Sequence, residues 1–166
     1  NGSFRPMKPK AVAESPVQVS IARSTRHAGV PPLREFERWA VAALGARARC
    51  VVSLLVVGPA RSRSLNLRYR GKDRATNVLS FPPAVAVDVE GGRPLLGDLV
   101  ICPSVLSREA REQDKRLRDH WAHLFVHGLL HLSGFDHESD EDARRMEGRE
   151  VRVLRSLGIA NPYRSH

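Results

Sequence analysis

The stretch at residues 50–59 reads CVVSLLVVGP, a continuous apolar, β-branched run that stops at a Gly-Pro pair. Such a run is typical of an interior strand that is covered on both faces. Upstream, residues 17–21 alternate apolar and polar side chains, which predicts a strand with one buried face. Residues 33–44 carry apolar side chains at helical spacing before Gly45, which predicts a helix that ends there. The chain therefore begins as strand, helix, strand.

The rest of the sequence predicts further elements in an order that defines the fold class. The pattern indicates a helix, two strands joined by a Gly-Gly hairpin-like connection, and three helices, at residues 60–69, 78–81, 97–102, 104–112, 118–133 and 140–157. The order β-α-β-α-β-β-α-α-α indicates one α+β (α/β-like) domain. We expect a mixed sheet of four to five strands packed with about five helices.

The predicted domain covers residues 17–160 and lies between two tails. Residues 1–16 contain Pro, Lys and small residues without the apolar run of a signal peptide, which predicts a disordered tail. Residues 161–166 are predicted to form a C-terminal tail. The NGSF start lacks an initiator Met, so we treat it as a candidate expression scar, with Met7 as the alternative natural start.

Composition restricts the classes of partner. Lys and Arg number 27 against 18 Asp and Glu, which gives a formal charge of +9. A surface this basic favours polyanions, either nucleic acid or anionic lipid, while the longest apolar run is far too short to span a bilayer. We therefore expect no membrane integration. Cys50 and Cys102 both fall at predicted strands, which suits free buried thiols in a reducing compartment and leaves too few cysteines for a zinc ribbon.

Residues 127–137 read HGLLHLSGFDH and carry the strongest functional signal. His127 and His131, four positions apart, share one helix face about 6 Å apart, where both imidazoles can converge on an ion. Gly134 then permits a turn that can bring back His137 to complete a site of three nitrogens at roughly 2.0–2.1 Å from the metal. A fourth position stays open for water, as in catalytic zinc sites. We expect one Zn²⁺ per chain, with zinc favoured over other metals mainly by availability.

Two neighbouring residues are candidates for support behind these ligands. His123 lies one turn before His127, with His120 close by, and either could orient a ligand. Asp136 precedes His137, where it could accept a hydrogen bond from a ligand imidazole or cap the turn. The sequence favours neither role of Asp136 over the other.

The same HxxxHxxGxxH spacing occurs in the metzincin peptidases, whose motif has a Glu directly after the first His as general base. Here Gly128 occupies that position, so the peptidase mechanism lacks its proton acceptor. A metzincin-like metallopeptidase is therefore only an alternative. Gly128 could leave open space beside the metal for a bulky phosphodiester, or it could allow close helix packing.

A basic segment precedes the third predicted strand. Its side chains suit contacts with a phosphate backbone, and the RNA-binding candidates are Arg61, Arg63, Arg68, Lys72 and Arg74. The alternative is an ordinary solvated basic face. Most of the few aromatic residues, Trp39 and Trp121 among them, occur at positions typical of the core, so we expect backbone electrostatics to outweigh base stacking.

Two segments of the chain resemble a known family, the YbeY endoribonucleases. They are residues 69–82, YRGKDRATNVLSFP, and residues 126–137; residues 97–101, GDLVI, resemble the family's strand before its helical half. The family usually has Pro where Ala75 stands.

The resemblance implies a cytoplasmic, single-strand-specific metallo-endoribonuclease. Its roles would be ribosomal RNA maturation, including the small-subunit 3′ end, and ribosome quality control. The implied partners are single-stranded and ribosomal RNA, the ribosome or small-subunit proteins, and an assembly GTPase. The family's zinc ligands fall on His127, His131 and His137, and its functional arginine falls on Arg70.

Arg70 is therefore the predicted catalytic residue. A guanidinium can grip two phosphoryl oxygens in a fixed planar geometry as charge develops on them. The alternative is that Arg70 pairs with Asp73 or another carboxylate and only fixes the loop. A third class of function also stays open, a non-catalytic ribosome assembly factor whose zinc is structural.

Overall fold

The computed structural model describes residues 15–164, so most of the predicted N-terminal tail and the last two residues lie outside the described part. In chain order the elements are β1 (Val17–Arg23), α1 (Leu33–Leu44), β2 (Cys50–Val56), α2 (Pro59–Arg70), β3 (Val78–Phe81), β4 (Asp88–Val89), the short 3-10 turn η1 (Glu90–Gly92), β5 (Arg93–Ile101), α3 (Pro103–Glu112), α4 (Leu117–Leu132) and α5 (Asp140–Ser156). The predicted α+β class with a mixed sheet and five helices is confirmed. The strand expected at 97–102 begins earlier, at Arg93, because it forms a hairpin with the unpredicted β4.

The sheet has the order β1-β2-β5-β3, and β4 pairs with the start of β5. β1, β2 and β5 run parallel, while β3 runs antiparallel to β5 along one edge. The predicted interior strand is β2, which has a parallel neighbour on each side. Parallel neighbours need crossover connections, and α1 and α2 provide the ones that enter and leave β2.

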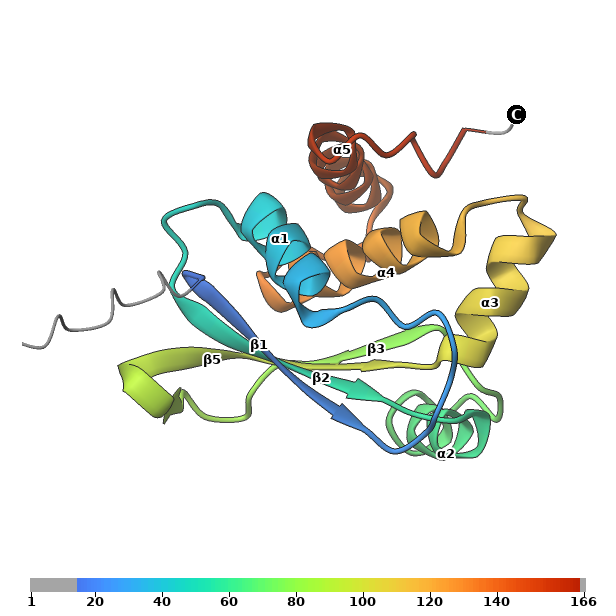
Figure 1. The fold of residues 1–166 in the computed structure, drawn as a ribbon, viewed down its shortest axis with the longest axis horizontal. Coiled ribbons are helices and arrows are strands. Elements are labelled where there is room, and N and C mark those ends of the chain that lie inside the picture. The colour runs from blue at the N-terminus through green and yellow to red at the C-terminus, as the bar shows by residue number, and fades with distance from the viewer. Residues whose placement is uncertain (1–14, 165–166) are drawn as a thin grey trace, which may run out of the picture.

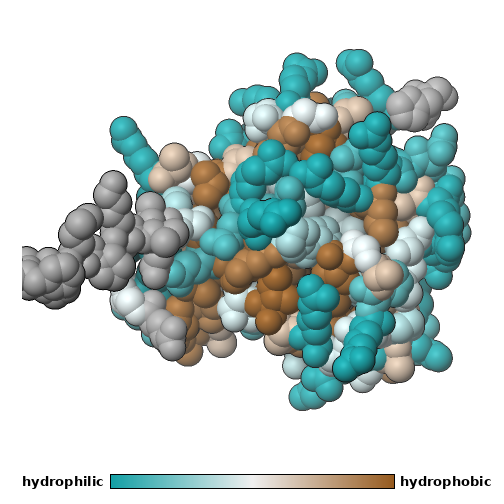
Figure 2. All heavy atoms as spheres, viewed as in Figure 1, coloured by the Kyte–Doolittle hydropathy of each residue, from teal (hydrophilic) through white to brown (hydrophobic). Residues whose placement is uncertain are grey.

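The helices form layers on both faces of the sheet (Figure 1). α1 and α4 cover one face, α5 packs outside them, and α2 covers part of the opposite face. α3 lies at the end of the sheet where β5 finishes. Figure 2 shows hydrophilic side chains over much of this view, with a hydrophobic band at the level of the sheet. No helix within residues 15–164 is long and apolar enough to cross a membrane.

The main core lies between the sheet and the α1–α4 layer. Phe36, Trp39, Trp121 and Phe125 are fully or almost fully buried there, with neighbouring ring centroids 5.0–6.3 Å apart. The prediction that both tryptophans belong to the core is confirmed. Cys50 and Cys102 are buried free thiols, also as predicted.

Two glycines let α4 approach the sheet closely. A Cβ at Gly128 would lie 2.7 Å from a methyl of Leu99, and one at Gly97 would lie 2.6 Å from a methyl of Leu132. Real Cβ atoms essentially never come so near, so each glycine accommodates a side chain of the opposing element. The interpretation that Gly128 opens space for a phosphodiester is wrong, because the position faces β5; the packing interpretation is correct.

The residues at both ends of the described chain are attached to the domain. Ser15 and Pro16, which the sequence assigned to the tail, accept hydrogen bonds of 2.8 and 3.0 Å from the buried Arg93 guanidinium. Residues 161–164, predicted as part of a C-terminal tail, return to the turn before α4, where the Pro162 carbonyl accepts a 2.9 Å hydrogen bond from Lys115 Nζ. This return matters for the site described next.

Candidate metal centre

α4 positions four histidines along one side, His120, His123, His127 and His131. Its other sides are buried against α1, β3 and β5, and this packing fixes the helix and therefore the histidine stripe. At its C-terminal end, Gly134 adopts a positive φ of 100° and the Phe135 amide donates to the Leu130 carbonyl at 3.0 Å. The chain therefore turns back sharply and brings His137 to the end of the stripe, as predicted.

The structure brings the three predicted ligands together. Nε2 of His127 lies 3.2 Å from Nε2 of His131, and their ring centroids are 4.7 Å apart. The His137 ring centroid lies 4.9 Å from that of His131 and 6.2 Å from that of His127. Two nitrogens bound to one tetrahedral zinc, each at roughly 2.0–2.1 Å, stand about 3.3 Å apart. The His127–His131 pair therefore has the separation that a shared ion requires.

The third predicted ligand, His137, is less well placed than the other two. No three His, Cys, Asp or Glu side chains of the described residues stand in a finished arrangement around one point. Rings bound through nitrogen to one tetrahedral zinc have centroids about 5 Å apart, which fits two of the three ring pairs but not His127–His137. His137 is exposed, so its ring has room to turn toward His127. Three imidazoles are a suitable donor set for a zinc ion, and the His137 ring must turn toward His127 to complete the site.

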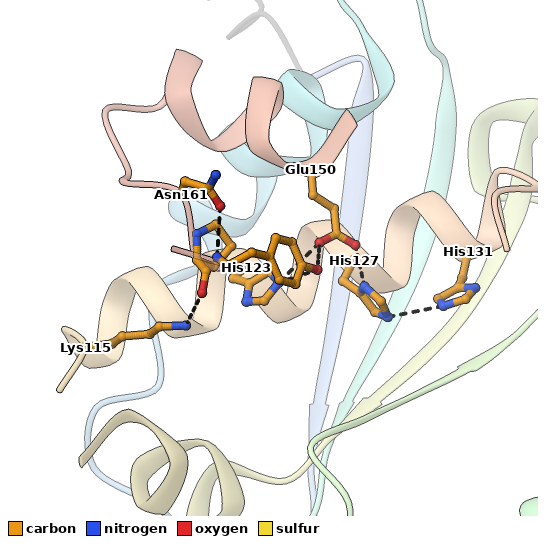
Figure 3. A network of polar contacts seen from close by, with 8 residues as sticks. Lys115, His123, His127, His131, Glu150 and Asn161 are labelled. Atoms are coloured by element: carbon orange, nitrogen blue, oxygen red, sulfur yellow. Dashed lines mark hydrogen bonds and ion pairs between the residues drawn. The ribbon is translucent and has the colours of Figure 1, made fainter. Parts of the chain in front are cut away.

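A buried carboxylate that sequence reasoning missed supports this pair from behind (Figure 3). Glu150 of α5 is 0% exposed, and its Oε1 accepts a 2.5 Å hydrogen bond from Nδ1 of His127. Because a carboxylate only accepts, His127 carries its proton on Nδ1 and turns the lone pair of Nε2 toward His131. A carboxylate behind a ligand imidazole fixes both ring orientation and tautomer in metal sites.

The charge states of these groups follow from their surroundings. Burial acts to raise the pKa of Glu150, but hydrogen bonds from its donors outweigh burial and bring the pKa down to about 2. Burial is also the main cause that lowers the pKa of His131 to about 4, and the neighbouring imidazoles and the Arg70 guanidinium lower it further. Glu150 is therefore ionised and His131 neutral at neutral pH, which is the state that metal binding needs.

The two upstream histidines have carboxylate partners of their own. Nε2 of His120 donates to Glu109 at 3.0 Å, and Nε2 of His123 donates to Glu150 at 3.2 Å. His123, a predicted support residue, thus shares a carboxylate with His127, and their ring centroids lie 6.3 Å apart.

Asp136 forms a turn contact and no imidazole contact. Its Oδ1 accepts a 3.3 Å hydrogen bond from the Glu138 amide, and its side chain borders a small hollow with Arg145 of α5. Of its two expected roles, the structure shows the turn.

Arg70, the predicted catalytic residue, ends α2 and is exposed. No described residue forms a hydrogen bond or ion pair with its guanidinium, while its positive charge acts on His131. Asp73, the expected alternative partner, instead receives two hydrogen bonds from Arg63, at 2.6 and 3.0 Å. Arg70 therefore presents a free guanidinium near the histidine site.

The loop after Arg70 is attached to α2 by two buried polar side chains. The Ser62 hydroxyl donates to the Thr76 carbonyl and accepts from the Thr76 amide, at 3.0 and 2.9 Å. Asn66 donates to the Arg74 carbonyl at 2.9 Å. These three hydrogen bonds hold the loop at two residues, Arg74 and Thr76, and fix the direction in which the chain leaves Arg70.

The remaining basic candidates are distributed along α2 and the loop that follows it. Arg61 lines a hollow on the opposite face of the sheet, together with Tyr69 and Phe81. Arg68 lies over the Tyr69 ring, 5.3 Å from its centroid, while Lys72 and Arg74 are exposed in the loop. Within this basic segment, Arg70 is a residue whose charge acts on His131.

Comparisons with known proteins point to one family. Residues 26–158 match the family described as Endoribonuclease YbeY. A protein of that name from Alkalilimnicola ehrlichii is 54% identical over 82% of this chain and 84% of its own length. Another, from Stenotrophomonas maltophilia strain R551-3, is 50% identical over 89% of this chain and 93% of its own. A third, from Nitrosococcus oceani, is 47% identical over 90% and 98%.

A solved structure shares the fold. It is the solution structure of TM1509 from Thermotoga maritima, which matches 86% of this chain and 91% of its own with a TM-score of 0.51. At 24% sequence identity, this likeness concerns the fold alone.

Proposed function

The chain belongs to the YbeY endoribonuclease family, and from this premise we propose that it is a zinc-dependent endoribonuclease that cleaves single-stranded RNA. The observation that carries the proposal is the 3.2 Å approach of His127 Nε2 and His131 Nε2, with His137 adjacent and Glu150 behind. We further propose that it acts in ribosomal RNA maturation at the small-subunit 3′ end and in ribosome quality control. On the basis of the family, we also propose that the protein acts in the cytoplasm. Its proposed partners are the ribosome or its small-subunit proteins, and an assembly GTPase.

The three histidines would hold one zinc ion. When bound, the ion would supply Lewis acidity toward the phosphoryl group or lower the pKa of a coordinated water. The protein's own part is to orient the imidazoles, which Glu150 supports by accepting a hydrogen bond from Nδ1 of His127.

Arg70 would hold the scissile phosphodiester. Its guanidinium is exposed, lacks a carboxylate partner among the described residues and lies within electrostatic reach of His131. Planar N–H pairs can grip two non-bridging oxygens and stabilise the charge that develops on them. The nucleophile is either water or the RNA 2′-hydroxyl, and the second leaves a cyclic phosphate end, so product-end analysis identifies it.

RNA is the polyanion that best fits the charge of the chain. A formal charge of +9 favours contacts with a phosphate backbone, and such contacts weaken as salt rises because condensed counterions are released. Lys72 and Arg74 are exposed cations in the loop that starts beside Arg70. They are candidates to contact the RNA strand on either side of the cleaved bond.

Peptide hydrolysis loses further support. A metzincin-like general base would have to stand at position 128, where even a Cβ would meet Leu99 at 2.7 Å. A carboxylate there would require the Leu99 side chain or the helix itself to shift. A structural zinc would be expected to have four protein ligands, whereas the site gathers three imidazoles.

The test is incubation of purified protein with a single-stranded RNA, its duplex form and a peptide pool, each with and without chelator. We expect cleavage of the single strand alone, lost with chelator and restored by zinc. A His131→Ala protein prepared in parallel controls for contaminating nucleases. Cleavage of peptides would indicate the peptidase, and RNA binding without cleavage by zinc-loaded protein would indicate an assembly factor; either result overturns the proposal.

A further inference from the structure

The segment after α5 reaches the histidine site through one hydroxyl. The Tyr163 hydroxyl donates to Oε2 of Glu150, the carboxylate that holds His127 through Oε1. The Tyr163 ring also lies edge-on to His123, with ring centroids 5.4 Å apart. Although 44% of Tyr163 is exposed, its hydroxyl ends at a carboxylate that is 0% exposed.

We infer that Tyr163 is a positioning residue: through Glu150 it fixes the orientation and tautomer of His127. Oε2 of Glu150 receives hydrogen bonds from Tyr163 and from His123, which leaves Oε1 for His127. Each hydrogen bond to the carboxylate restricts its rotation about the last bond, and Tyr163 supplies one of the two on Oε2. The Nδ1 proton of His127 therefore has one fixed acceptor, and Nε2 keeps one direction.

Tyr163 is itself held in place by the surrounding turn. Its amide donates to Oδ1 of Asn161 at 2.9 Å, and the neighbouring Pro162 carbonyl accepts from Lys115 Nζ at 2.9 Å (Figure 3). The Lys115 contact joins the segment to the turn before α4, so the hydroxyl approaches Glu150 from a fixed side. A free tail could not orient a carboxylate in this way.

The inference rests on the proposed zinc site, and its first test is zinc affinity. The chain has two tyrosines, so Tyr163→Phe and the matched control Tyr69→Phe each remove a single hydroxyl. Zinc affinity is measured by competition with a chromogenic chelator. We expect Glu150→Gln to weaken zinc binding by roughly 10–100-fold, and Tyr163→Phe by about 3- to 10-fold because His123 still holds Oε2. Tyr69→Phe should bind as the wild type does.

The second test does not need the metal. Long-range proton–nitrogen NMR spectra of metal-free protein show which ring nitrogen of His127 carries the proton, and the same spectra verify that each variant is folded. We expect a proton on Nδ1 in the wild type and in Tyr69→Phe, and a shift toward the other tautomer in Tyr163→Phe.

The two tests separate two failures. A folded Tyr163→Phe protein with wild-type zinc affinity and an unchanged His127 tautomer overturns the inference. If the wild type binds no zinc, the proposed function fails, and the tautomer measurement still decides whether Tyr163 orients His127.

Discussion

The two halves of α4 carry the same kind of residue and use it differently. In the first half, His120 and His123 direct Nε2 at the carboxylates of Glu109 and Glu150. In the second half, His127 donates a hydrogen bond from Nδ1 to Glu150, and its Nε2 faces His131. An imidazole that donates from Nε2 to a carboxylate joins two helices. One that donates from Nδ1 to a carboxylate can present the lone pair of Nε2 to a metal.

The comparison shows that regular spacing does not assign a role. All four histidines recur on one side of the helix, so periodicity alone makes each a candidate ligand. The ring nitrogen that donates to the carboxylate distinguishes the two roles. It is Nε2 in the structural histidines and Nδ1 in the candidate ligand His127. Four experiments break or sharpen this distinction, from the largest expected effect to the smallest.

Removing a histidine of the second half should empty the site. We expect His131→Ala or His137→Ala to lower zinc affinity more than about a hundredfold, beyond the 10–100-fold typical of a supporting residue. Elemental analysis of purified, folded protein gives the metal content. His123→Ala should retain close to one zinc per chain. The ligand assignment is wrong if His123→Ala empties the site while His137→Ala stays loaded.

Replacing Arg70 should separate chemistry from metal binding. Arg70→Ala should keep zinc and lose RNA cleavage by roughly 10²–10³-fold, the scale of one transition-state donor. Arg70→Lys should restore little, because an ammonium lacks the planar fork. The matched control is Arg152→Ala, an exposed arginine of α5. Zinc-loaded Arg70→Ala that cuts at the wild-type rate would exclude the proposed clamp.

A pair of helical glycines tests how tightly the histidine helix sits on the sheet. Gly128→Ala should lower the free energy of unfolding by about 1–3 kcal/mol, because its Cβ meets Leu99 at 2.7 Å. Gly148→Ala on α5 has nothing within 4 Å, so the better helix propensity of alanine should raise stability by about 0.5–1 kcal/mol. Urea unfolding of both variants measures the two signs. Equal effects would mean that α4 has room to move.

Glu109 of α3, which accepts a hydrogen bond from His120 in the first half of α4, should contribute stability that depends on pH. Burial acts to raise the pKa of Glu109, but hydrogen bonds from His120 and Asn77 outweigh it, so the pKa is lowered. A lowered carboxyl pKa contributes stability that is present above the unfolded pKa and is lost as pH falls through the folded pKa. Glu109→Gln should therefore cost about 1 kcal/mol at pH 7. Unfolding at acid pH should show the difference shrinking, and a constant difference would contradict the linkage.

Local patterns in the sequence predicted most of the fold. The interior strand β2 and the limits of α1 follow from nearest neighbours along the chain. The start of β5 and the existence of β4 could not be predicted from local sequence, because a two-residue strand is stabilised only by its partner. The packing role of Gly128 likewise depends on Leu99, which the sequence cannot place opposite it.

Motif spacing selected the three histidines, but it could not reveal the groups behind them. Glu150 comes from another helix, and its sequence signal is weak: it is a carboxylate on the stripe of α5 that also contains Met146, Val153 and Leu154. A charge on a buried face calls for a partner. Tyr163 gives no such signal, because it lies in a short polar segment without periodicity.

The order of the strands also bears on how the protein folds. α4, its turn and α5 follow one another along the chain, so the imidazoles and Glu150 can meet through contacts that are close in sequence. Arg70 reaches them only once β2 and β5 have paired in parallel, with α2 and β3 between them along the chain. Pairings between distant segments form slowly. We therefore expect a nascent chain to assemble the proposed metal ligands early and to position Arg70 last, so that the proposed RNA cleavage would begin only when folding is complete.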